Sequence, residues 1–376
     1  EALNDDDQAM LRSWYLDHSK DAAAARKSIE AMRRKFPKPS TTLVMQERPQ
    51  EHLRPTHRHH RGEFLSPREV VRPEVLPFLP PLAKDQARDR LGLARWLVDP
   101  RNPLTARVTV NRYWAELFGE GIVPTLDDFG YTGTMPSDPA LLDWLALEFI
   151  RQGWSRKKLL RLIVTSATYR QQTSSNYRLS AEQIRDSLLQ VSGLLHPKLG
   201  GPSVFPPQTK SIGEGIWGGG SWRTSTGPDR YRRSLYTHRK RSMPYAMHDT
   251  FDAPSHEACI ARRDRSNTPL QALMLLNNNS ILESSRALGN WAAQQKGNEE
   301  AVIHALFQRV LTRPPDAHEM KVMAGFHAKQ TKRFTADKKM ATEIAGPNPK
   351  ASPEAVAAWV ALARSLLNTH EFITRN

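Results

Sequence analysis

The side chains best suited to chemistry lie in one long stretch, residues 197–265, that has no helical or strand periodicity. Among them are His238, His248, Asp249, Asp252 and His256. Imidazole and carboxylate groups are metal ligands, so this group could form a hydrolytic metal centre. One hypothesis is therefore a catalytic site built on His248, Asp249 and Asp252. A loop of this length is functional or disordered, and its aromatic residues predict that it is ordered.

Cys259, in the same stretch, is the single cysteine of the chain, which excludes internal disulfides and four-cysteine metal sites. The Cys-x-x-Cys-His attachment of c-type haem is also excluded, and we expect no cofactor in this chain. Arg262 and Arg263 stand close by, and cations favour the reactive thiolate form of cysteine. The alternative, which we favour, is a buried and inert thiol.

The densest histidine group of the sequence is His57, His59 and His60. A metal site would need further ligands that converge on it, and neither a cysteine nor a clear pair of carboxylates completes one. We therefore predict a surface histidine tract, and no metal site in the chain.

Positive charge is a second chemical feature, because 54 Lys and Arg against 39 Asp and Glu give a formal charge of +15. Residues 230–241 contain six of these cations and no acid. Arginine binds carboxylate, sulfate and phosphate groups, and aromatic rings add stacking faces. The predicted binding residues are Arg230, Arg232, Arg233, Tyr236, Arg239, Arg241, Arg262 and Arg263. An acidic protein surface or an anionic polysaccharide fits better than nucleic acid, since no helix-turn-helix, zinc-finger or RNA-recognition signature is present.

Amphipathic periodicity on both sides of the loop predicts a mainly α fold: an irregular multi-helix domain with long ordered loops and a few short strands. Expected helices begin at Lys84 and near Ser180, and span 105–118, 140–152, 155–170, 269–277, 280–294, 299–311, 316–329 and 353–367. A short hairpin is expected at 234–239. The polar and basic section 329–351 is predicted to be a mobile connector. No run of the sequence reaches the roughly 18 apolar residues of a membrane span.

The N-terminal part of the sequence differs from the rest. Asn4 can cap one long helix that continues to about Lys35, and we expect residues 1–40 to complete a preceding domain. Residues 41–83 are predicted to be an extended linker that begins with a short strand at 41–45. The helical domain is then expected to span residues 84–376.

A further group of polar residues follows the expected helix 105–118. Arg107 and Asn111 are four residues apart and share one helix face. With Asp127 or Asp128 they could close an anion site. The alternative is scaffolding, in which an Arg–Asp pair ties the following loop to the helix.

Several strings in the sequence together resemble one known family. They include Asn102-Pro103-Leu104-Thr105-Ala106-Arg107-Val108, Asn111-Arg112-Tyr113-Trp114, Asp127-Asp128-Phe129-Gly130, Ile184-Arg185-Asp186, Arg232-Arg233-Ser234-Leu235-Tyr236 and Thr268-Pro269-Leu270-Gln271. On these residues, over most of positions 40–376, the chain resembles the PSD-type domain of unknown function of planctomycetes. Asp138 and Leu160 stand where histidines are common in that family. The motif residues are expected to be mainly architectural: Arg107, Asn111, Arg112, Trp114, Asp127, Asp128 and Gln271.

The resemblance also implies a cellular setting. Similar proteins carry this domain at the C-terminal end of large exported chains, commonly behind a PSCyt2-like domain and a c-type cytochrome domain. From the resemblance we expect a periplasmic or cell-envelope location, and haem c in an upstream region or in a partner.

The sequence favours a non-catalytic function, in which the Arg- and Tyr-rich loop docks a protein partner within a cytochrome-associated complex. The alternative is a hydrolase or binding protein for anionic, sulfated polysaccharide at the His-, Asp- and Arg-rich part of the loop. A third possibility is general polyanion binding, for which affinity would fall steeply with salt.

Overall fold

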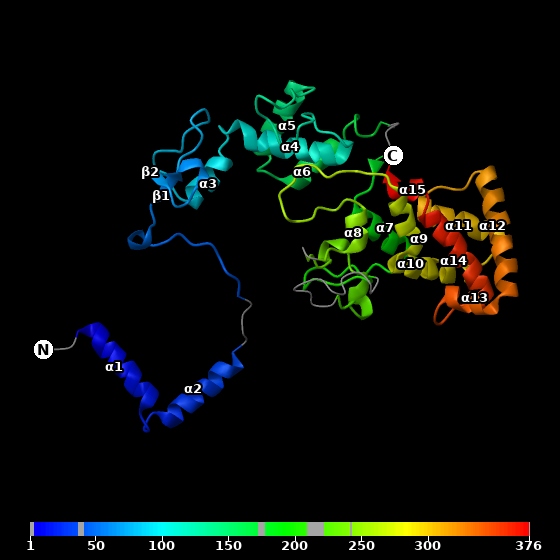
Figure 1. Cartoon of the computed structure of the whole chain (residues 1–376), viewed down its shortest axis with the longest axis horizontal. Coiled ribbons are helices and arrows are strands. Elements are labelled where there is room, and N and C mark those ends of the chain that lie inside the picture. The colour runs from blue at the N-terminus through cyan, green and yellow to red at the C-terminus, as the bar shows by residue number, and fades with distance from the viewer. Residues whose placement is uncertain (1–3, 37–40, 172–176, 209–221, 241–242, 376) are drawn as a thin grey trace. The chain divides into compact units, whose positions relative to one another are not determined.

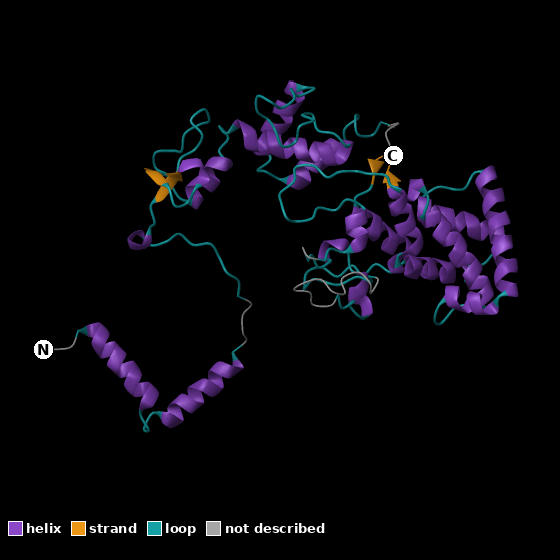
Figure 2. Cartoon of the chain, viewed as in Figure 1, coloured by secondary structure: helices purple, strands orange, loops and turns teal. Residues whose placement is uncertain are grey.

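The computed structural model describes residues 4–36, 41–171, 177–208, 222–240 and 243–375. Within these ranges the fold is mainly α, as predicted, and the strands form two small two-stranded sheets (Figure 1, Figure 2). None of the helices in these ranges has the length and apolar character needed to cross a bilayer. The chain divides into two compact units, residues 1–99 and residues 100–376.

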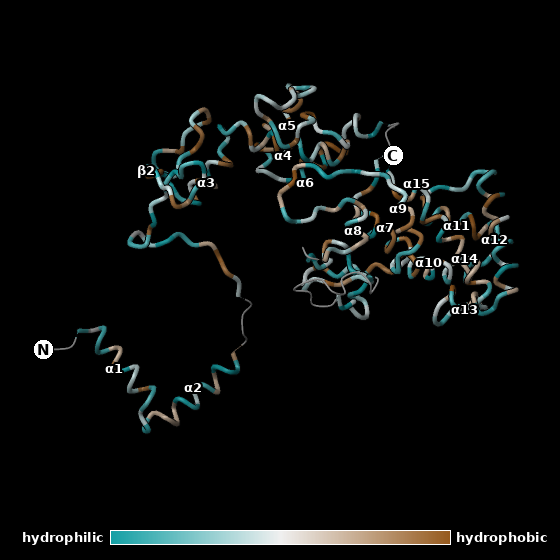
Figure 3. The backbone as a smooth tube through the Cα atoms, in the orientation of Figure 1, coloured by the Kyte–Doolittle hydropathy of each residue, from teal (hydrophilic) through white to brown (hydrophobic). Residues whose placement is uncertain are grey.

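The first unit begins with two helices, α1 (Asp5–His18) and α2 (Ala23–Lys35), where the sequence predicted one. Asn4 caps α1 as expected, because its side chain accepts a hydrogen bond from an amide in the first turn. The break comes at Ser19, whose backbone is extended and whose hydroxyl accepts an amide two residues on. Serine competes for backbone hydrogen bonds in this way. Figure 3 shows both helices as mainly hydrophilic, with short apolar stretches.

Residues 49–81 contain a hairpin that the sequence did not predict, formed by β1 (Thr56–His59) and β2 (Pro67–Val71). Its strands are charged and mostly exposed, so the alternation of apolar and polar residues that signals a strand is missing. The expected strand at 41–45 is wrong, because those residues have no regular structure. The other elements of this unit are η1 (Gln50–His52), η2 (His60–Gly62) and α3 (Arg90–Leu97).

The second unit opens with a small helical cluster of α4 (Pro103–Phe118), α5 (Pro139–Arg151) and α6 (Arg156–Val164). Side chains cap the start of each helix: Asn102, Asp138 and Ser155. Asp138 therefore has a structural role as the N-cap of α5. The cluster buries Val110, Leu142, Leu145, Phe149, Leu159 and Ile163. These helices were predictable because caps and apolar periodicity are local signals.

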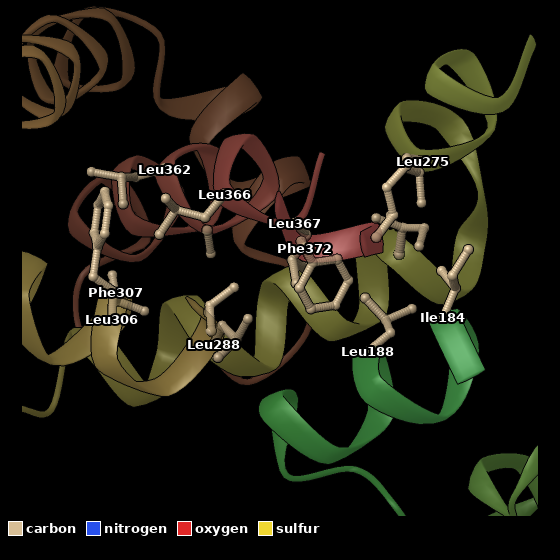
Figure 4. Packing of buried hydrophobic residues seen from close by; sticks show 14 of the residues in the cluster. Ile184, Leu188, Leu275, Leu288, Leu306, Phe307, Leu362, Leu366, Leu367 and Phe372 are labelled. Carbon is tan, nitrogen blue, oxygen red and sulfur yellow. The ribbon is translucent and has the colours of Figure 1, made fainter. Parts of the chain in front are cut away.

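The larger core lies among helices that are distant in the sequence. They are α7 (Ala181–Ser192), α9 (Pro269–Asn277), α10 (Asn279–Ala292), α11 (Glu299–Leu311), α14 (Pro353–Leu367) and α15 (His370–Ile373). Figure 4 shows Leu288, Leu366 and Phe372 gathered between them. Burial of such side chains stabilises the fold by about 25 cal/mol per Å² of apolar surface. The core therefore gives α7 a firm position from which to hold the long loop.

Most of the section 329–351 is helical, so the prediction of a mobile connector is wrong. It contains the end of α12 (Ala317–Ala336) and all of α13 (Lys338–Ala345). Phe334, Ala341 and Ala345 are buried in a cluster with residues of α14. The many lysines made the section look fully solvated, although small alanines on one face pack closely against the neighbouring helix.

The end of the described chain joins the α4–α6 cluster to the larger core of the second unit. β4 (Thr374–Arg375) pairs antiparallel with β3 (Tyr177–Arg178). The guanidinium of Arg375 donates to the carbonyls of Glu116 and Leu117, at 2.7 and 3.0 Å, near the end of α4. Residues more than 250 positions apart thus fix this part of the unit.

Close packing of α10 on α14 gives a test of the core. A Cβ added at Gly289 would lie 2.5 Å from Cγ2 of Val360 and 2.8 Å from its backbone N. Gly289→Ala should therefore push the helices apart and lower the free energy of unfolding by roughly 1–3 kcal/mol.

Gly325→Ala on α12 is the matched control, because nothing lies within 4 Å of the added Cβ. It should raise the free energy of unfolding by up to about 1 kcal/mol through helix propensity alone. Urea unfolding followed by circular dichroism measures both values, and equal effects of the two substitutions would contradict the close contact.

Candidate functional site

Helix α7 holds the long loop through two adjacent side chains, Arg185 and Asp186. The fully buried guanidinium of Arg185 donates to the carbonyl of Arg232 at 2.8 Å and to Oγ of Ser234 at 3.3 Å. Asp186 accepts a hydrogen bond from the backbone N of Ser234 at 2.6 Å and from Nε of Arg233 at 3.1 Å. We call this set of contacts the α7 lock.

Arg232 extends the α7 lock further into the loop, because its own guanidinium is also buried. Nη1 donates to the carbonyl of Pro202 at 3.0 Å, and Nη2 bonds the carbonyls of Lys198 and Gly200. The guanidinium carbon lies 3.8 Å from the centre of the Tyr236 ring, and the Tyr236 hydroxyl accepts from the amide of Gly200. A buried guanidinium needs acceptors for its donors, and here the loop backbone supplies them for the Nη groups, whereas Nε of Arg185 and Nε of Arg232 have no partner among the described residues.

Residues 234–239 do not form the expected hairpin. The loop instead makes the 3₁₀ turns η3 (Gly227–Tyr231) and η4 (Ser234–Tyr236). Isolated parallel bridges connect it to earlier positions, His196 to Arg232 and Val204 to Thr237. Long-range contacts, which local sequence patterns do not encode, therefore order this stretch.

The other predicted binding arginines are also largely engaged within the molecule. Arg230 contacts Glu283 of α10 at 3.2 Å. Glu182 of α7 accepts from Arg239 at 3.2 Å and from Arg263 at 2.6 Å. Burial alone would raise the pKa of Glu182, but the hydrogen bond and charge of Arg263 hold that pKa low, at about 2. Much of the arginine cluster is thus internal scaffolding.

Asp252 makes contacts that separate it from the proposed catalytic group. Its carboxylate pairs with Arg178 at 2.5 Å and accepts from the backbone N of Ser266 at 2.9 Å. Gln271 donates to the hydroxyl of the same Ser266 at 2.9 Å. Asp252 has φ +60°, a conformation that aspartate tolerates better than most residues. Its carboxylate is therefore used to fix the backbone and does not join His248.

His248 and Asp249 lie on the short helix α8 (Ala246–Thr250) and line a cavity of about 170 Å³. The other polar side chains in its wall include His238, Arg239, Lys240 and His256. We call this space the histidine cavity. It unites three of the histidines that the sequence analysis singled out.

His248 is only 5% exposed, and its Nε2 has no hydrogen-bond partner among the described residues. Burial lowers the pKa of the imidazole to about 4; Glu182 opposes this shift, whereas Arg185 and Arg239 support it. The ring is therefore neutral at neutral pH, with one N–H donor and one nitrogen acceptor.

Residues 255–265 form an exposed segment, which we call the arm. Cys259 lies on it and is exposed, so the prediction of a buried thiol is wrong. Ile260 is 52% exposed. Arg262 is exposed and makes no hydrogen bond or ion pair with any residue that the structure describes. Arg241, another predicted binding residue, lies outside the described residues.

A groove of about 600 Å³ lies beside the arm. Glu116 and Glu120, from α4 and the loop after it, line one part, and Arg262 and Arg265 of the arm line another. Tyr177 also lines it, and the guanidinium carbon of Arg265 lies 5.3 Å from the centre of that ring. Because it presents charges of both signs, we call it the bipolar groove.

Arg107 does not form the anion site considered from the sequence. It pairs with Asp143 of α5 at 2.6 Å, not with Asp127 or Asp128. Asp128 instead accepts the amide of Gly130 at 2.7 Å and stabilises a turn. The Arg–Asp pair therefore joins two helices.

Asn111 ties the loop after α4 to the helix. Its fully buried amide donates to the carbonyl of Val123 at 2.8 Å and accepts the Val123 amide at 2.9 Å. Trp114 stacks on Phe118 one turn later, whereas Arg112 is exposed.

Metal ligation has no support in the part of the chain that the structure describes. Those residues contain no group of three or more His, Cys, Asp or Glu side chains arranged to hold an ion. In the tract at 57–60, the ring Nδ1 of His57 is hydrogen-bonded to the carbonyl of Arg68.

One comparison with known proteins gives a match. The family model described as PSD1, protein of unknown function (DUF1553), matches residues 89–327. This range includes α4, the α7 lock, the histidine cavity and the arm. No curated protein and no solved structure matches the chain.

Loss of the α7 lock should destabilise the second unit. Arg185→Met removes the donors to the Arg232 carbonyl and the Ser234 hydroxyl, and the unsatisfied buried acceptors should cost roughly 3 kcal/mol. Arg112→Met is the control, because this arginine is exposed on α4, and its effect should stay within about 0.5 kcal/mol. Urea unfolding measures both, and a near-zero effect of Arg185→Met would contradict the role of the lock.

The buried His248 should make stability depend on pH between about 6.5 and 4. Its pKa is lower in the folded chain, so the unfolded state binds the proton first and stability falls as the pH drops through this window. Between pH 7.5 and pH 5 the loss from this group should be about 2 kcal/mol.

His248→Gln isolates this contribution, because the comparison uses the change with pH and not the absolute stability of each chain. When the pH is lowered from 7.5 to 5, the urea midpoint should fall more for the wild type than for His248→Gln. An equal fall in the two chains would show that His248 titrates alike in the folded and unfolded states.

Proposed function

The chain belongs to the PSD1 family of proteins of unknown function, and from that premise we propose that it is a non-catalytic docking module for a protein partner. The bipolar groove carries the proposal. An extended segment of the partner would lie in it, with acidic side chains near Arg262 and Arg265 and basic side chains near Glu116 and Glu120.

The arm is held firmly although its surface is exposed. His256 contacts Arg239 near one end, Arg263 is paired with α7, and Ser266 is bonded to Asp252 just beyond the other end. A segment that is already held in place loses little conformational entropy when a partner binds. Such an arrangement suits recognition better than a free loop does.

An apolar contact would add to the charges. Ile260 lines the groove and is half exposed, next to the exposed Cys259. Binding energy at protein interfaces is concentrated in a few side chains that lose their water. Ile260 and the neighbouring arginines are the candidates for that role.

The internal pairing of Arg230, Arg232 and Arg239 narrows the docking surface from the whole arginine cluster to the arm. It also reduces the support for general polyanion binding, since fewer free cations remain to neutralise phosphates or sulfates. The separate contacts of Asp252 reduce the support for a hydrolase with His248 and Asp249.

The resemblance noted from the sequence suggests the setting of the partner. In this proposal the partner is a c-type cytochrome, or a haem-bearing region of the same exported protein, in the periplasm or cell envelope. Haem c would then belong to the partner, because the single cysteine of this chain cannot supply the two thioether links.

Arg262→Glu should weaken docking at least about tenfold, because it places a repulsive charge where the partner carries an acid. Arg112→Glu makes the same charge change on an exposed face of α4 and should leave docking intact. The chains are purified with a tag from native cells, and co-purified proteins are quantified by mass spectrometry and by haem absorbance.

Cross-linking through Cys259 adds a direct readout, since a photo-cross-linker on this cysteine can react at a single position of the chain. The same partner should be captured by the wild type and by Arg112→Glu, but not by Arg262→Glu. Equal partner recovery with both variants would contradict docking in the bipolar groove, and purification without any stoichiometric partner would contradict the docking function.

A further inference from the structure

The histidine cavity has properties that docking at the arm does not use. Its wall combines cationic, neutral and anionic side chains: Arg239, Lys240, His238, His248, His256 and Asp249. At about 170 Å³ it is smaller than the usual 300–1,000 Å³ of sites for drug-sized ligands. It could hold a compact metabolite of a few heavy atoms.

The hydrogen-bonding state of His256 follows from its neighbour. Arg239 contacts its Nε2 and has only donors to offer, so Nε2 must accept and Nδ1 carries the proton. Burial lowers the pKa of His256, and the positive charge of Arg239 lowers it further. His256 is thus a neutral donor in the cavity wall.

His248 supplies the independent indication of a ligand. Its side chain is 95% buried, lines the cavity and has an unpartnered ring nitrogen among the described residues. Buried polar groups normally have a hydrogen-bond partner, and an orphaned one calls for an explanation. Because Nε2 is itself shielded from solvent, a bound molecule would become its partner only after a local shift of the ring or of the cavity wall.

The charges of the wall indicate which ligand fits. Arg239 and Lys240 favour an anion, but the exposed carboxylate of Asp249 would repel a second negative charge. The carboxylate of Asp249 makes no hydrogen bond or ion pair with the described residues and can accept from a hydroxyl group. Glu182 has both carboxylate oxygens bonded to Arg239 and Arg263, so it neutralises part of the positive charge.

We propose that the histidine cavity is a binding site for a small hydroxycarboxylate with a single negative charge. The carboxylate would lie near Arg239, Lys240 and the histidine donors, and a hydroxyl group of the ligand would donate to Asp249. This cavity adjoins the bipolar groove at Pro254 but has different polar side chains in its wall, so either proposal can fail without the other.

Glycerate is the probe. Glycerol is the control that has the same carbon frame but no carboxylate, and acetate is the control that has a carboxylate but no hydroxyl group. Isothermal titration with the full chain should show saturable glycerate binding below about 10 mM, and at least about tenfold weaker binding of glycerol and acetate. Inorganic phosphate, with its larger charge, should also bind more weakly than glycerate.

His256→Asn tests the donor, since His256 is exposed and asparagine tolerates its φ of +65°. It should weaken glycerate binding about tenfold, whereas the same change at His304, exposed on α11, should have no effect. Asp249→Asn should weaken glycerate binding more than acetate binding, because only glycerate offers a hydroxyl group.

Absence of saturable glycerate binding would overturn the proposal. So would equal binding of glycerate and glycerol, or equal effects of His256→Asn and His304→Asn. If acetate or phosphate bound as tightly as glycerate, the site would recognise a bare anion, and the hydroxycarboxylate assignment would be wrong.

Discussion

The second unit depends on one costly arrangement, the burial of two guanidinium groups that cannot lose their charge. Arg185 and Arg232 are both fully buried, and an arginine in this position must find oxygen acceptors for its donors. Carbonyl groups of irregular backbone meet this need for the Nη donors, whereas the carbonyl groups of a helix are already bonded. The long loop therefore has to pass around the two arginines, and this requirement orders a stretch with little regular structure.

A cluster of basic residues in a sequence can therefore be internal scaffolding and not a binding surface. A run of arginines suggests a charged surface, but here Arg230 and Arg239 are paired with acids of α10 and α7. Arg262, further along the chain on the arm, faces solvent instead. Buried or paired arginines thus hold the loop in place, whereas an exposed arginine on the arm belongs to the proposed docking surface.

The sequence predicted the helices well where their signals are local. The helices at 299–311 and 353–367 have the predicted bounds, because asparagine and serine caps and apolar periodicity mark them. It failed for α13, whose buried face consists mainly of alanines among lysines, and for the hairpin at 56–71, whose strands are charged. The apolar periodicity on which a prediction from sequence depends is weak in both elements.

The candidate site was harder to predict than the fold. His248, Asp249 and Asp252 are near neighbours in the sequence, yet the positive φ of Asp252 and its bond to Arg178 separate its carboxylate from the other two. Glu182 and Asp186 were overlooked as partners of the loop arginines. Their spacing of four residues on one helix face was the available signal, but their partners lie about 50 to 80 positions away.

The central claim is that a rigid loop presents an exposed arm to a partner, and amide hydrogen exchange tests it most directly. In the isolated chain, the amides of Val204, Ser234 and His238, which are bonded within the loop and to α7, should exchange nearly as slowly as those of the core helices. Amides of residues 256–265 should exchange fast, and slow down when the co-purified partner is present. Fast exchange throughout the loop, or an arm unaffected by the partner, would contradict the account.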